Sequence, residues 1–206
     1  LVSDLLDETD ETVILTIGTP TNAGVGATGA HTLTINDDDA TPTVQFTAAA
    51  QSVGEAGGTG TVTVELSAAS GLPVSVPYVV TGDASDPADY TIAPNPLLIP
   101  AGMTSASALI TINDDALDEA DETVVLTMGT PVGALQGTLT VYTLTVSDDD
   151  AAPTVEFVSS AQSEAEGASS ATVTAQISAV SSFVVTVPYT VSGDATDPDD
   201  YTIAPN

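Results

Sequence analysis

The chain has 206 residues, of which 29 are Asp or Glu and none is Lys or Arg, so its formal net charge is −29. Repulsion from phosphate groups excludes unaided binding to nucleic acid or to anionic membranes, and cations are the expected partners. A hydrophobic content of 42% is enough for a packed core, and the absence of Cys excludes disulfides and thiolate-bound metals. No apolar run reaches the length of a membrane span, and we expect any targeting segment to lie outside this sequence.

Short runs of alternating or β-branched residues, separated by Gly, Pro, Asp and Asn, dominate the sequence. In Val62, Val64 and Leu66, for example, apolar residues alternate with polar ones, which predicts a strand with one buried face. Pro77 interrupts one run and indicates an edge strand or a bulge. The runs predict an all-β fold, a seven-stranded antiparallel immunoglobulin-like sandwich, with strands at 43–47, 61–66, 74–81, 90–92, 106–112, 123–129 and 139–147.

The sequence also repeats itself. The stretch DLLDETDETVILTIGTP at 4–20 returns 111 residues later as DALDEADETVVLTMGTP at 115–131, and residues 1–95 and 112–206 are identical at 53 of 95 positions. We therefore divide the chain into the C-terminal part of one repeat (1–39), a complete repeat (40–150) and the N-terminal part of the next (151–206). We expect the chain to be a segment of a longer tandem array; completion of 1–39 by 151–206 of another chain is the alternative.

The acidic residues of the complete repeat gather at one end of the predicted sandwich. If consecutive strands alternate in direction, thirteen of its fourteen acids fall in loops at the same pole, and only Glu65 lies in a strand. Packing carboxylates a few Å apart costs on the order of 1 kcal/mol per pair even in a water-like dielectric. Oxygen ligands at flexible spacing favour Ca²⁺ over zinc, copper or magnesium. The alternatives are a solvated acidic surface and carboxylate catalysis.

These motifs resemble the Calx-β family, known from regulatory domains of the sodium–calcium exchanger and from repeats of large surface and adhesion proteins. The matching elements are Glu55, GDASDPADYT (82–91), INDDALDEADETV (112–124) and DDD (148–150). The resemblance implies calcium ligands at one pole, with a backbone carbonyl near Leu117 and the carboxylates of Glu55, Asp89, Asp114, Asp115, Glu119, Glu122, Asp148, Asp149 and Asp150. Four other acids of the same pole are expected to stay in solvent: Asp83, Asp86, Asp118 and Asp121.

The two part-repeats carry incomplete versions of this set. The first departs from the pattern at Ser3, which stands where Asp114 does, and keeps Asp4, Glu8, Glu11, Asp37, Asp38 and Asp39. The last has only Glu166 and Asp200 at ligand positions. We expect neither part to bind calcium as the complete repeat does unless a neighbour supplies the remainder.

These observations predict a non-enzymatic calcium-binding repeat of a long extracellular or cell-surface protein, an adhesin stalk or a filament. Only Ala151, Ala152 and Pro153 separate one acidic pole from the next repeat, so Ca²⁺ is expected to stiffen the junction between neighbouring repeats joined end to end, and chains are candidates for a homo-oligomeric filament. A calcium sensor or an adhesive ligand-binding module is the alternative. The single His31 is expected on a strand surface, and direct membrane insertion and nucleic-acid binding are not expected.

Overall fold

The structure is a computed structural model that describes residues 1–203, so the last three residues of the third predicted segment lie outside it. The chain forms two compact units. One unit comprises Leu1–Asp114 and Asp121–Ser147, and the other comprises Asp115–Ala120 and the residues from Asp148 onward. The loop segment 115–120 is therefore grouped with the following repeat and not with the strands that flank it in sequence.

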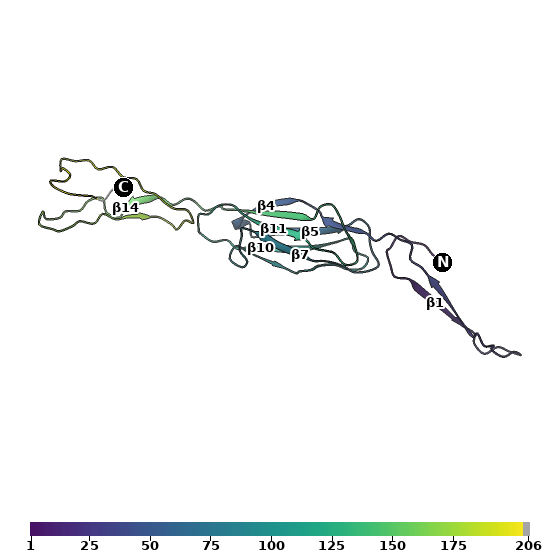
Figure 1. The fold of residues 1–206 in the computed structure, drawn as a ribbon. Helices are drawn as coiled ribbons and strands as arrows, with labels where there is room; N and C mark the ends of the chain where they lie inside the picture. Colours follow the sequence, from purple (N-terminus) through teal and green to yellow (C-terminus); the bar gives the residue numbers. More distant parts are fainter. Residues whose placement is uncertain (204–206) are drawn as a thin grey trace. The chain divides into compact units, whose positions relative to one another are not determined.

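The complete repeat folds as two packed sheets, whose strands β4, β5, β7, β10 and β11 lie side by side in Figure 1. The five-stranded sheet has the order β12 (Leu135–Gln136), β3 (Thr43–Phe46), β5 (Thr59–Leu66), β10 (Ser105–Ile112) and β8 (Tyr90–Ala93). The four-stranded sheet has the order β4 (Ala50–Gly54), β13 (Val141–Ser147), β11 (Glu122–Met128) and β7 (Tyr78–Gly82). A short pair joins β6 (Val74–Val76) to β9 (Leu97–Ile99), and a 3₁₀ turn, η1, spans Glu55–Gly57.

The core lies between the two sheets and follows the alternation predicted from the sequence. Val62, Val64 and Leu66 of β5 are buried, while Thr63 between them is half-buried and Glu65 is exposed. Removing such side chains from water is the main stabilising term of the sandwich. The predicted all-β, immunoglobulin-like sandwich is confirmed.

Two details differ from the predicted strands. First, the structure adds β4, β9 and β12, and two of the strand pairs, β4–β13 and β12–β3, run parallel. The sequence of β4, AQSVG, has little intrinsic preference for a strand, and its pairing with β13 overrides that preference. Second, the predicted strand 74–81 divides at Pro77 into β6 and β7, and β7 is an edge strand of its sheet.

The part-repeats form short hairpins. β1 (Glu11–Thr16) pairs antiparallel with β2 (Ala30–Ile35), and β14 (Val155–Phe157) pairs antiparallel with β15 (Ala175–Ile177). Among the described residues, no helix has the length and apolar character that crossing a membrane requires.

Candidate metal centre

The register of the four-stranded sheet places Glu55 at one end of the sandwich. β4 and β13 run parallel, and their last pair is Gly54 with Ser147. Each of these strands is followed at once by an acid, Glu55 after β4 and Asp148 after β13. Glu55 is only 7% exposed, although the sequence contains no Lys or Arg to neutralise its carboxylate. A buried carboxylate is costly without a cation, so this position favours a metal ligand.

The register of the five-stranded sheet brings the 82–91 motif to the same end. Ile112 at the end of β10 pairs with Tyr90 at the start of β8, so Asp114 and Asp89 lie just beyond a shared edge. Asn113 fixes this arrangement, because its backbone N–H donates to the Asp89 carbonyl at 2.9 Å and its Nδ2 donates to the Pro87 carbonyl at 2.6 Å. One Asp89 carboxylate oxygen closes its own loop by accepting from the Ser85 N–H at 2.6 Å.

Asp83 connects the 82–91 loop to the start of β11 by hydrogen bonds. At that point Glu122 of β11 pairs with Val146 of β13. The Asp83 Oδ1 accepts from both the backbone N–H and the hydroxyl of Thr123, each at 2.6 Å. These hydrogen bonds, the side-chain one first, lower the pKa of Asp83 below its usual value of 3.8. We expected Asp83 to stay in solvent, and it is exposed, but its hydrogen bonds also hold two loops of the acidic pole together.

The acids of the first part-repeat are brought together by the β1–β2 hairpin. Loss of solvation, followed by repulsion from Asp4, Glu11, Asp37 and Asp39, raises the pKa of Glu8. Loss of solvation, followed by repulsion from acids that include Asp37, Asp38 and Asp4, raises the pKa of Asp39. Between them, Glu8 and Asp39 are repelled by each of the other four predicted ligands of this segment. Mutual repulsion of this kind is relieved by a bound cation.

The remaining predicted ligands lie on loops of the second compact unit. Asp115 is exposed, and its Oδ1 accepts from the Leu117 N–H at 2.8 Å, a contact that Asp4 and Leu6 also make at 3.0 Å. Glu119, Asp148 and Asp150 are half-buried, whereas Asp149 and Glu166 are exposed. Asp200 closes its own turn by accepting from the Thr196 N–H at 2.8 Å, and this hydrogen bond is the main cause of its lowered pKa. These positions leave their ligand roles as predictions.

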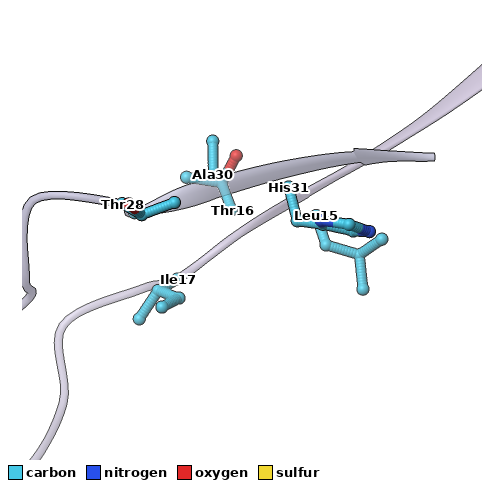
Figure 2. Close-up of a pocket in the computed structure, with 7 residues that line it drawn as sticks. Leu15, Thr16, Ile17, Thr28, Ala30 and His31 are labelled. Atoms are coloured by element: carbon cyan, nitrogen blue, oxygen red, sulfur yellow. The ribbon is translucent and has the colours of Figure 1, made fainter.

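The shallow hollow in Figure 2 is a different kind of feature. It lies on the β1–β2 hairpin, where Leu15 and His31 are cross-strand neighbours whose side chains point to the same side. Its lining is aliphatic apart from His31 and two threonines. The hollow offers no set of oxygen ligands comparable to the acidic loops.

The sequence model of the Calx-beta domain matches residues 37–147 and again residues 148–205. The chain belongs to the Calx-beta domain family. Members of this family bind Ca²⁺ and are non-catalytic binding modules, and the all-oxygen donor set of the acidic pole fits that ion. The matched boundaries begin at Asp37 and Asp148, so each DDD stretch opens a family match where we had placed it at the end of a repeat.

Among solved structures, the Calx-beta chain is similar to CBD12 from CALX1.2, at 26% identity and a TM-score of 0.49, over 57% of this chain and 48% of that one. It is also similar to the apo form of the Calx CBD1 domain, at 24% identity and a TM-score of 0.49, over 54% of this chain and all of that one. The match thus spans about half the length of the CBD12 structure. No curated protein matches the chain.

Sequence reasoning found the acids but missed the residues that position them. Asn113 and Thr123 make the hydrogen bonds that hold two acidic loops together, yet neither was singled out. A signal was present for Thr123, because the ETV that contains it recurs as Glu11–Val13 in the first copy. No such signal existed for Asn113, since Val2 stands at its position in the first copy.

Proposed function

We propose that this chain is a calcium-binding structural repeat whose acidic pole takes up Ca²⁺ and stiffens the connection to the next repeat. The observation that carries the proposal is the 7% exposed Glu55 carboxylate at the end of β4, in a chain without Lys or Arg. The strand registers that bring Asp89, Asp114 and Glu122 to the same end support it. Ca²⁺ would be held by carboxylate and carbonyl oxygens, with no redox or acid–base step.

The setting that we propose is a long extracellular or cell-surface protein, in which such repeats act as a stalk or a filament. Repeats of equal length that share more than half of their residues and follow one another without long linkers suit a spacer of uniform mechanical properties. Extracellular calcium is millimolar, so weak sites would remain filled there. Neighbouring repeats joined end to end are the proposed partners.

Calorimetric titration and thermal unfolding test the calcium proposal. After dialysis against EGTA, added Ca²⁺ should bind and raise the melting temperature, while Mg²⁺ at the same concentration should do so much less. Glu55→Gln should weaken binding at least tenfold. Its matched control is Glu65→Gln, an exposed acid in the middle of β5, which should leave binding unchanged. If Ca²⁺ releases no heat and leaves the melting temperature unchanged, the proposal is wrong.

The measured affinity also separates the proposed role from the other candidates. A dissociation constant in the range of about 10⁻⁴ to 10⁻³ M fits an extracellular structural module, whereas about 10⁻⁷ to 10⁻⁵ M fits a calcium sensor. Scattering profiles recorded with Ca²⁺ and with EGTA would show whether the metal changes the stiffness of the chain. A filament or stalk role predicts a stiffer chain with the metal present.

A further inference from the structure

The same contact between an acidic loop and a Ser-containing turn occurs twice in the chain, 111 residues apart. An isolated parallel bridge joins Asp7 to Ser70, and another joins Asp118 to Ser181. Each contact lies within one compact unit. In both cases the Asp belongs to the acidic loop of one repeat, and the Ser belongs to the acid-free turn between the second and third predicted strands of the following repeat.

The first contact centres on the backbone carbonyl of Asp7, which accepts two hydrogen bonds. The Gly71 N–H donates at 3.1 Å and the Ser70 hydroxyl donates at 3.2 Å. Ser70 is 1% exposed, and its Oγ also accepts from the Leu72 N–H at 3.0 Å. A buried hydroxyl that donates to one segment and accepts from another holds the two together, because losing either partner would leave a buried polar group unsatisfied.

The second contact repeats this geometry with different side chains. The Ser182 N–H donates to the Asp118 carbonyl at 2.9 Å, and the Phe183 N–H donates to the Ser181 Oγ at 3.1 Å. The Ser181 hydroxyl donates to the Asp118 carboxylate at 2.6 Å. Asp118, which we expected in solvent, is therefore half-buried and hydrogen-bonded.

The differences between the two contacts show which atoms they require. Gly71 is replaced by Ser182, yet the N–H of that residue donates to the Asp carbonyl in both. The Asp7 carboxylate accepts from the Thr41 hydroxyl at 3.1 Å, whereas the corresponding residue Ala152 has no hydroxyl and the Asp118 carboxylate accepts from Ser181 instead. The invariant part is the backbone carbonyl of the Asp with the Ser and the N–H that follows it.

We propose that this pair of contacts is a docking site between consecutive repeats that forms without metal, the occupant being the next copy of the repeat in the same chain. The Asp carbonyl faces the neighbouring turn, while nearby acids, Glu8 and Glu119, remain predicted calcium ligands. The docking bond uses a backbone carbonyl, which leaves the loop's carboxylates available to a metal, and the Glu8 carboxylate lies directly against Gly71 of the docked turn. Docking orients the next repeat, and the metal acts on a loop that is already attached.

Amide hydrogen exchange of the whole chain, measured by NMR in EGTA, tests the docking site. The Gly71 and Ser182 amides should exchange at least about tenfold more slowly than in an unstructured peptide, because each is held by an Asp carbonyl. The Gly129 amide, which donates to the Pro77 carbonyl within one repeat at 2.8 Å, is the internal reference for folding. Exchange of Gly71 and Ser182 at unstructured rates in EGTA, with Gly129 protected, would overturn the proposal.

Two variants sharpen the measurement. Ser70→Ala should speed exchange at Gly71 about tenfold and leave Ser182 and Gly129 unchanged, because it removes the two hydrogen bonds of the Ser70 hydroxyl, to the Asp7 carbonyl and from the Leu72 N–H, at one docking site only. Gly71→Ser copies the sequence of the second contact and should keep residue 71 protected, once the flexible Glu8 side chain, whose Oε1 would lie 2.6 Å from the new Cβ, has moved aside. The result is independent of calcium binding, so a chain that binds no Ca²⁺ but keeps these amides protected in EGTA would retain the docking site and lose only the calcium role.

Discussion

The β1–β2 hairpin and the β11–β13 pair are two copies of one sequence with the same register and opposite surroundings. Glu11 pairs with Ile35 as Glu122 pairs with Val146, and the agreement continues along the strands. Val124, Leu126 and Leu144 are fully buried, whereas their counterparts Val13, Leu15 and Leu33 are 45%, 58% and 40% exposed. Local sequence therefore sets the pairing and register of a hairpin, and the rest of the sandwich sets the burial of its apolar face.

The β14–β15 and β3–β5 strand pairs also share one register and differ in burial. Val155 pairs with Ile177 as Val44 pairs with Leu66, 111 residues earlier. Phe157 is 58% exposed in the part-repeat, and its counterpart Phe46 is 1% exposed in the complete repeat, where its ring lies 6.0 Å from that of Tyr142. An aromatic side chain contributes to stability only where such neighbours exist.

The largest expected difference in stability between the two copies comes from truncating the Leu residues at equivalent positions, Leu126 and Leu15. Leu126→Ala should destabilise the complete repeat by roughly 2–5 kcal/mol, because it leaves a cavity in the core. Leu15→Ala, at the corresponding exposed position, should cost no more than about 0.5 kcal/mol. Urea unfolding followed by circular dichroism checks both values, and equal effects of the two changes would contradict the comparison.

A smaller effect is expected from replacing Asn113 by Val, the residue at its position in the first copy. The variant removes the Nδ2 donor to the Pro87 and Ala88 carbonyls, at 2.6 Å and 3.0 Å, and should destabilise the repeat by about 1–2 kcal/mol. It should also weaken calcium binding, because Asp89 and Asp114 lose their mutual placement. The matched control is Val2→Asn, for which neither stability nor calcium affinity should change.

Tyr142 and His31 occupy the same place in the two hairpins and provide a third comparison. Tyr142 is 2% exposed, and its hydroxyl donates to the Gln51 Oε1 at 2.8 Å. Tyr142→Phe should therefore cost about 0.5–1.5 kcal/mol. His31→Phe, at an exposed strand position, should leave thermal unfolding unchanged, and a larger loss there than at Tyr142 would mean that the part-repeat has its own stabilising contacts.

The smallest expected effect is a change in stability at low pH. It is tested by comparing Asp83 with Asp194, the residue at the equivalent position of the last part-repeat. The folded-state pKa of Asp83 is lowered below 3.8, so its stabilising contribution is present above pH 3.8 and is lost as the pH falls through the folded value. Asp83→Asn should therefore lower the melting temperature at pH 5 more than at pH 2, whereas Asp194→Asn should leave the melting temperature unchanged at both values. A pH-independent effect of Asp83→Asn would show that charge does not contribute to its bond with Thr123.

The sequence alone determined the repeat, most of the strands and the family, and it predicted that the acids gather at one pole. Each of these depends on local periodicity or on comparison of the chain with itself, for example in Val62 and Val64 or in the two DDD stretches. The prediction of an acidic pole follows from strands that alternate in direction, because such strands return every second loop to the same end.

Only the tertiary structure decided which residues hold that pole together and what lies beside it. The strand β4 is weakly encoded and forms because β13 pairs with it, and this pairing places Glu55 at its buried position. Asn113 and Thr123 act through partners 25 to 40 residues away, and Asp118 acts through Ser181, 63 residues away. Such contacts depend on long-range geometry that no local pattern encodes, so of two closely similar stretches of sequence one can be buried and the other exposed.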